Sequence, residues 1–181
     1  EAVGVAKVRA CQPARLVGDQ ARQQAREALQ AVLGIVASDL DLGAVGKGYA
    51  LDRMAAQLAE WSVTTACLQS GGSTALALAP PSGHSGWPVG LGEDATHRLL
   101  SLSQVALSGS GIAVQGAHLI DPRTGAPAPR TTRAWALAPT AALSDALSTA
   151  FFVLSEADIA AFCAAHPAIG AASALSGTQL A

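Results

Sequence analysis

The segment 39–53, DLDLGAVGKGYALDR, places three glycines and a lysine at the expected start of a helix. The apolar residues that follow recur every three to four positions, which predicts a helix from near Gly46 to about Trp61. The amides of Gly46 and Gly48 would then lie at the positive end of the helix dipole, where a ligand approaches closely because glycine has no side chain. With the charge of Lys47 added, the segment predicts a site for a phosphate-bearing ligand, with or without a metal ion. The alternative is a tight turn that needs glycine only for its backbone geometry.

Two common phosphate-binding motifs do not occur in this segment. A Walker loop needs a glycine five residues before its Gly-Lys pair and a Ser or Thr after it, whereas this chain has Asp41 and Gly48 there. A dinucleotide fingerprint of the GxGxxG type is also absent. The sequence therefore excludes both of these nucleotide-binding arrangements.

A carboxylate and a hydroxyl suited to a metal ion occur in the late segment 144–154, SDALSTAFFVL. If this segment is helical, Asp145 and Thr149 lie four residues apart and share one face. Two such oxygens suit Mg²⁺, which prefers hard oxygen ligands and usually keeps places for water and phosphate. The alternative is that Asp145 only favours the helix dipole while Thr149 bonds back to a backbone carbonyl.

A histidine precedes a predicted turn in the segment 117–127, AHLIDPRTGAP. We expect a strand to end at Ile120 and a tight turn to follow, ordered by Asp121. The turn itself does not require a histidine. His118 is therefore a candidate for ligand contact or proton transfer, although a structural role is the alternative.

Two further segments, 69–73 and 107–111, end predicted strands with glycine and serine, which lets the backbone approach a ligand. Ordinary turns have the same composition. Neither segment contains a GxSxG nucleophile elbow, and His84 and His97 have no recognisable triad context, so serine hydrolase chemistry is not expected.

Helices and hairpin-like strands must position these groups. We expect an α+β fold in a single domain, 1–181, with a mixed, largely antiparallel sheet and packed helices, because no regular βαβ repeat occurs. Residues 1–34 would form a strand and a helix, and residues 35–175 the core. The expected strands are 3–10, 35–42, 64–69, a second strand that ends at Leu78, 87–91, 98–102, 104–108, 112–120, 132–138 and 168–175, and the expected helices are 19–33, 47–60 and a pair over 140–165 that meets near Ser155.

Composition limits the class of partner. The chain has 181 residues, of which only 13% are charged, and a formal net charge of −2 without a basic block, which argues against nucleic acid. No apolar run approaches the length of a membrane span. The three cysteines contain no CxxC pair, so we expect them to be reduced and structural: Cys11, Cys67 and Cys163.

Taken together and in order, these motifs resemble the ApbE family of Mg²⁺-dependent FAD:protein FMN transferases. The matching stretches are DLGAVGKGYALDRMA at 41–55, QSGGSTALAL at 69–78, SGSG at 108–111, HLIDPRTGAP at 118–127 and SDALSTAFFVL at 144–154. The resemblance covers roughly 35–175, and residues 1–34 carry none of the family motifs.

The resemblance implies a role for each site residue. Mg²⁺ would be held by Asp145, Thr149 and the main-chain carbonyl of Ala44. Lys47 and the amides of Gly46 to Gly48 would add positive potential near the FAD pyrophosphate. His118 and Ile120 would lie along the flavin nucleotide, Asp41 would shape the turn, and the expected catalytic residues are Asp145 and His118.

The activity implied by the resemblance is transfer of FMN from FAD to a Ser or Thr hydroxyl of a partner flavoprotein, with release of AMP. If water replaces that hydroxyl, the protein would be an FAD pyrophosphatase. The rival interpretation is a shortened, non-catalytic module that binds flavin or protein, because family members usually carry an N-terminal portion that completes the flavin cleft. A partner chain could also supply that part, so a homodimer is a further expectation.

The cellular location has two possible answers at this point. The resemblance implies the bacterial cell envelope or periplasm, to which members of this family are typically exported. The chain shows no export signal, and a cytoplasmic location is expected if Glu1 is close to the natural start.

Overall fold

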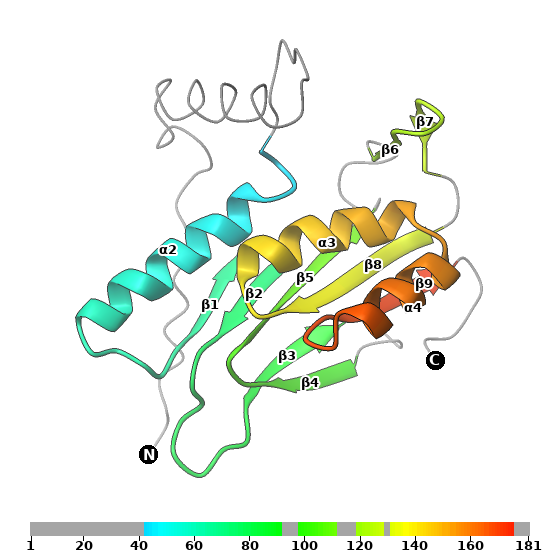
Figure 1. Cartoon of the computed structure of the whole chain (residues 1–181). Coiled ribbons are helices and arrows are strands. Elements are labelled where there is room, and N and C mark those ends of the chain that lie inside the picture. Colours follow the sequence, from blue (N-terminus) through cyan, green and yellow to red (C-terminus); the bar gives the residue numbers. More distant parts are fainter. Residues whose placement is uncertain (1–41, 92–97, 112–118, 129–130, 176–181) are drawn as a thin grey trace, which may run out of the picture.

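The computed structural model describes residues 42–91, 98–111, 119–128 and 131–175. A five-stranded antiparallel sheet forms its centre, with the strand order β1-β2-β5-β8-β9 (Figure 1). Its strands are β1 (Cys67–Ser70), β2 (Thr74–Ala77), β5 (Val105–Gly111), β8 (Thr131–Ala138) and β9 (Gly170–Leu175). The expected α+β class with a largely antiparallel sheet is confirmed.

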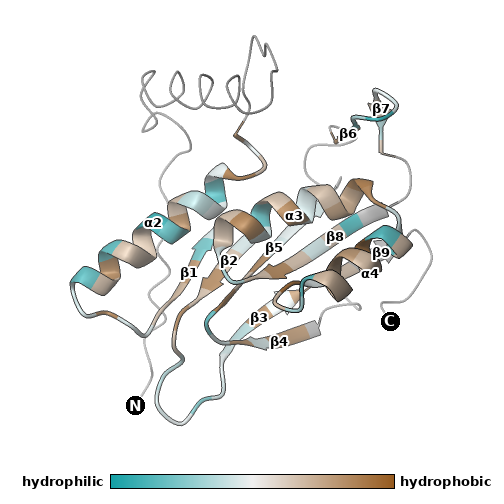
Figure 2. Cartoon of the chain, viewed as in Figure 1, coloured by the Kyte–Doolittle hydropathy of each residue, from teal (hydrophilic) through white to brown (hydrophobic). Residues whose placement is uncertain are grey.

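One face of the sheet is covered by helices α2 (Gly46–Glu60), α3 (Ala141–Val153) and α4 (Glu156–Ala165). Alternate sheet residues face them because side chains in a strand alternate between the two faces. Leu76 and Ala106 pack against Leu51 of α2, while small alanines of β8 pack against Phe151 of α3. Figure 2 shows that α3 is apolar along much of its length, as its position over the sheet requires.

The other face of the sheet is covered by a two-stranded ribbon, β3 (Trp87–Leu91) and β4 (Arg98–Leu102). Val89 and Leu102 from the ribbon pack against Leu107 and Trp135 from the sheet. A small hairpin, β6 (Ile120–Asp121) and β7 (Ala126–Pro127), forms a separate two-stranded unit.

The observed helices agree with the expected ones. α3 and α4 meet at Ser155, whose hydroxyl accepts a hydrogen bond from the Asp158 N–H at 3.2 Å and so caps α4. Thr140 caps α3 in the same way by accepting from the Leu143 N–H at 3.3 Å. No helix in the described ranges has both the length and the apolar character needed to cross a membrane.

The strands differ most from expectation at the start of β1 and the end of β5, with smaller shifts at other ends, and β7 was not expected. β1 begins at Cys67 rather than residue 64, because residues 64–66 form only an isolated bridge and loop hydrogen bonds with the chain around Ala79. β5 continues to Gly111 rather than ending at 108, because its pairing with β8 extends to Arg133.

Some expectations fall wholly or partly on residues that are not described. These are the N-terminal strand and helix, nearly all of the strand 35–42, most of the strand 112–120, Cys11, Asp41, His97 and His118. Cys67 and Cys163 are free thiols, as expected, and burial raises the pKa of the Cys67 thiol.

The backbones of α2 and α3 approach closely at Gly48. A Cβ atom placed on it would overlap the carbonyl oxygen of Ala141, which is backbone and has no rotamer that relieves the clash. Gly46 lies two residues earlier, at the start of α2. A Cβ atom placed on it would have only Leu42 Cβ within 4 Å, at 3.8 Å.

We therefore predict that Gly48→Ala lowers the free energy of unfolding by about 3 kcal/mol or more, because α3 must move away from α2. Gly46→Ala is the matched control and should leave stability unchanged or raise it by about 0.5–1 kcal/mol, since alanine favours helix and restricts the unfolded chain. Urea unfolding of both variants measures the difference. Equal stability of the two would contradict the close helix contact.

Candidate active site

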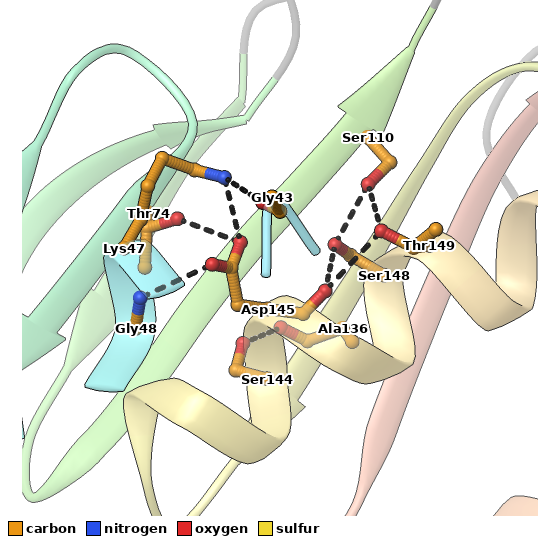
Figure 3. A network of polar contacts seen from close by, with 10 residues as sticks. All are labelled: Gly43, Lys47, Gly48, Thr74, Ser110, Ala136, Ser144, Asp145, Ser148 and Thr149. Carbon is orange, nitrogen blue, oxygen red and sulfur yellow. Dashed lines mark hydrogen bonds and ion pairs between the residues drawn. The ribbon is translucent and has the colours of Figure 1, made fainter. Parts of the chain in front are cut away.

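The side chain of Asp145 lies at the junction of α3, α2 and β2 and is 3% exposed (Figure 3). Its Oδ2 accepts a hydrogen bond from the Gly48 N–H at 3.1 Å, and its Oδ1 accepts one from Thr74 Oγ1 at 3.2 Å. Lys47 Nζ lies 3.3 Å from the same Oδ1. A buried carboxylate is tolerated only when it is paired and hydrogen-bonded, and here partners from two other elements do both.

The Asp145 carboxylate accepts a hydrogen bond at the N-terminus of α2 and not at that of its own helix, α3. It lies in the second turn of α3, and the first turn of α3 contains no acidic residue. α2 has Val45 at its N-cap position and no side-chain cap bond from it, so the Asp145 carboxylate supplies an acceptor there. The alternative in which Asp145 only favours the dipole of α3 is therefore wrong.

The ammonium of Lys47 lies between two oxygen ligands. It donates to the Gly43 carbonyl at 3.1 Å and pairs with Asp145 Oδ1 at 3.3 Å (Figure 3). A loop carbonyl and a buried carboxylate thus hold a positive charge at this point. Both are oxygen groups, and one is anionic, which is the kind of ligand that Mg²⁺ prefers.

Thr149 lies one turn beyond Asp145 on α3 and faces strand β5. Its Oγ1 is 3.1 Å from Ser110 Oγ, which is also 2.9 Å from Ser148 Oγ. Its bond back to the Asp145 carbonyl is long, at 3.5 Å, while Ser148 makes a shorter one at 2.9 Å. Segment 107–111 therefore contributes a hydroxyl next to Thr149, a contact that the sequence analysis did not predict.

A pocket of about 750 Å³ brings several of the predicted residues together. Ala44, Lys47 and Thr149 line one part of it, and the β1–β2 turn and the end of β5 line another. Six of its lining residues are glycines, so backbone forms much of its wall: Gly43, Gly71, Gly72, Gly90, Gly109 and Gly111. The pocket therefore admits a ligand close to the main chain. Asp145 is not among the lining residues, but it pairs with Lys47, which is.

The amides of Gly46 and Gly48 do not point at the pocket as free donors for a ligand, which was the simplest expectation. Gly46 N–H donates to the Leu42 carbonyl at 2.7 Å and Gly48 N–H donates to Asp145. Both amides are thus used inside the protein. Any contribution they make to anion binding comes from the potential at the end of α2 and not from direct hydrogen bonds.

Thr74 is a site residue that the sequence analysis missed. It is 3% exposed and directs its hydroxyl at Asp145. The signal was present, because Thr74 and the apolar Leu76 are two residues apart and therefore share the helix-covered face of β2. Nothing local, however, indicates that Asp145 lies opposite.

Asp121 orders the β6–β7 hairpin, as expected. It accepts hydrogen bonds from the backbone N–H and the guanidinium of Arg123, and Arg123 also reaches the Val153 carbonyl at the end of α3 at 3.2 Å. Leu119, just before the hairpin, lines the pocket. Ile120 is 49% exposed, and its predicted contact with a flavin stays a prediction, as does the role of His118.

Among the residues described here, no group of three or more His, Cys, Asp or Glu side chains surrounds a common point. A metal at this site would therefore depend on one carboxylate together with hydroxyl and carbonyl oxygens. The resemblance implied such a set, with Ala44, Asp145 and Thr149, and that ligand set stays a prediction.

Comparison with known proteins identifies the family. A model of the ApbE family matches residues 6–172. The chain belongs to the ApbE family. The match begins well before the first of the quoted motifs and includes most of the N-terminal residues that carry none of them. No match is found among curated proteins.

Solved structures of ApbE proteins have the same fold. An ApbE protein from Thermotoga maritima is 27% identical, with a TM-score of 0.64 over 79% of this chain and 50% of that chain. The flavin transferase ApbE from Vibrio cholerae is 18% identical, with a TM-score of 0.69 over 94% and 61%. The apo flavinyl transferase ApbE of Pseudomonas stutzeri is 22% identical, with a TM-score of 0.66 over 78% and 48%. The chain thus spans about half to three fifths of the length of these ApbE structures.

The hairpin of this ApbE chain gives a pH-dependent prediction. Hydrogen bonds from the side chain and then the backbone of Arg123 lower the pKa of Asp121 to about 2. Because an unfolded aspartate has a pKa of about 3.9, the pair favours the folded hairpin above about pH 4, and this contribution is lost as the pH falls towards 2. Arg123→Gln should return the pKa of Asp121 towards about 3.9.

Carboxyl-detected NMR titration measures this pKa. In the unmodified protein, Asp121 should show no titration above about pH 3, as far down as the fold survives. Arg53→Gln removes the same charge from an exposed position on α2 and should leave the titration of Asp121 unchanged. A normal aspartate titration in the unmodified protein would show that the hairpin pair is not formed.

Proposed function

We propose that this chain carries the metal and pyrophosphate part of an FAD:protein FMN transferase. The observation that carries the proposal is the convergence of Lys47, buried Asp145 and Thr149 at the pocket beside the N-terminus of α2. Membership of the ApbE family and the names of the flavin transferases with this fold support flavin transfer as the general activity. FAD as donor, Mg²⁺ dependence and AMP as product are part of the proposal.

The residues of this chain would hold Mg²⁺ through the Asp145 carboxylate, the Thr149 hydroxyl and the Ala44 carbonyl. The ammonium of Lys47 already marks a place where carboxylate and loop carbonyl oxygens accept a positive charge. When bound, the metal would withdraw negative charge from the pyrophosphate oxygens. Lys47, on a flexible side chain that is 40% exposed, would place a second positive charge near the same phosphates.

The proposed reaction forms one bond, breaks one bond and gives two products. A Ser or Thr hydroxyl of the acceptor attacks the phosphorus on the FMN side of the pyrophosphate, and the bond from that phosphorus to the bridging oxygen breaks. FMN is then esterified to the acceptor and AMP leaves with the bridging oxygen. The hydroxyl proton must be accepted, and we assign this role to His118.

Two other functions follow from specific features. Water in place of the acceptor hydroxyl would give FMN and AMP, which is FAD pyrophosphatase activity. A non-catalytic flavin- or protein-binding role is the other candidate, because no group of three or more His, Cys, Asp or Glu in the described part of the chain could hold a metal ion. A second copy of the chain could complete the cleft, which a measurement of mass in solution tests. We retain the cell envelope as the proposed location.

The central prediction concerns turnover of FAD at high protein concentration. The unmodified protein should release AMP and FMN with Mg²⁺ and not with excess chelator. Asp145→Asn should lower the rate by at least about 100-fold, because it removes the charge that offsets the metal and Lys47. Chromatography of the nucleotides measures both products. Flavin that stays on a denatured candidate acceptor distinguishes transfer from hydrolysis.

Asp158→Asn is the matched control. Asp158 is an exposed residue in the first turn of α4, and its loss should leave the rate unchanged. Circular dichroism of the two variants establishes that each is folded. Equal rates with and without Mg²⁺, or an active and folded Asp145→Asn variant, would overturn the assignment. No release at all from the unmodified protein would favour the binding module.

A further inference from the structure

The N-termini of α2 and α3 are joined by reciprocal hydrogen bonds. Asp52 of α2 accepts from the first two amides of α3, Ala141 N–H to Oδ1 and Ala142 N–H to Oδ2, both at 2.8 Å. Asp145 of α3 accepts from Gly48 N–H in the first turn of α2. Figure 1 shows the starts of the two helices next to each other. Each helix therefore provides an anionic cap for the other.

The spacing on the two helices is the same. Gly48 and Asp52 are four residues apart on α2, and Ala141 and Asp145 are four residues apart on α3, so on each helix the donor amide and the acceptor carboxylate share one face. Between them, the bare backbone of Gly48 lies against the Ala141 carbonyl. The bidentate contact of Asp52, the buried contact of Asp145 and the close backbone approach at Gly48 thus fix the position of α3 against α2.

We propose that Asp52 is a positioning residue for the candidate active site: by holding the first turn of α3 against α2, it fixes the Asp145 carboxylate opposite Lys47 and Thr74. This inference rests on the proposed function where ligand binding is concerned. Asp52 is half-buried and acts through the helix contact, whereas Lys47 and Thr74 contact Asp145 directly.

Position matters here because Asp145 has little tolerance for displacement. Its two oxygens contact groups from α2 and β2 at 3.1 to 3.3 Å, so a shift of α3 by a fraction of an ångström lengthens several bonds together. Thr140 provides a contrast, because it caps the same end of α3 from within the loop and makes no bond to α2. Loss of Thr140 weakens α3 without releasing it from α2.

The experiment compares Asp52→Asn with Thr140→Ala. Asparagine keeps the shape of the side chain but replaces one acceptor oxygen by an NH₂ group, which faces a backbone N–H and breaks the bidentate contact. Amide hydrogen exchange at Gly48 and binding of Mn²⁺ in the presence of FAD, followed by electron paramagnetic resonance, are measured for both variants. Urea unfolding places the two variants on a common stability scale.

Asp52→Asn should raise the exchange rate of the Gly48 amide about tenfold and weaken Mn²⁺ binding by a similar factor, because the bond to Asp145 is loosened. Thr140→Ala should leave both within about twofold once its stability loss is taken into account. Asp52→Glu restores the charge on a longer stem and should give an intermediate result, and it replaces Asp52→Asn in both measurements if that variant does not fold.

Equal effects of Asp52→Asn and Thr140→Ala on both readouts would overturn the inference and leave Asp52 as an ordinary helix cap. If the unmodified protein binds no Mn²⁺ with FAD and releases no AMP, the proposed function fails. The exchange rate at Gly48 still decides the role of Asp52 in that case, since it reports the contact with Asp145 without any ligand.

Discussion

The buried carboxylate of Asp145 is the group on which the rest of this structure depends. A charge that is 3% exposed requires partners, and the partners come from Lys47 and Gly48 of α2 and from Thr74 of β2. These elements lie far from α3 in the sequence, so the carboxylate is satisfied only when the sheet and both helices are assembled. Folding and formation of the site are in this sense one event.

The same contact explains the composition of the loop before α2. Because Asp145 supplies an acceptor for the first turn, the loop needs no Ser, Thr, Asp or Asn at its N-cap and has Val45 there. Residues 43–45 are therefore available to present small side chains and carbonyl oxygens, and Gly43 uses its carbonyl to hold Lys47.

The sequence predicted the three described helices well because their signals are local. Apolar periodicity marked α2, and the α3–α4 junction was found at Ser155, which is the cap of α4. The end of β5 was missed because glycine and serine provide no apolar alternation, and only pairing with β8 carries the strand to Gly111. Local residue types locate the helices, whereas the bounds of strands such as β1 and β5 depend on their neighbours.

The sequence indicated candidate site residues but not the contacts between them. Motif order and family resemblance pointed to Lys47, Asp145 and Thr149, and Lys47 and Thr149 line one pocket. The bonds from Asp145 to Gly48 and from Asp52 to the start of α3 join residues about 90 or more positions apart, and no spacing rule reaches that far. Asp52 belongs to the motif at 41–55, but its hydrogen bonds to the Ala141 and Ala142 amides become evident only in the folded chain.

A crystal structure of this chain with FAD and Mn²⁺, with the metal located by its anomalous scattering, tests the central claim most directly. The account predicts one strong peak within coordination distance of an Asp145 carboxylate oxygen, the Thr149 hydroxyl and the Ala44 carbonyl, with the pyrophosphate next to it and Lys47 turned towards the phosphates. A peak elsewhere, or bound FAD with Lys47 still paired to Asp145 and no metal between them, would contradict it.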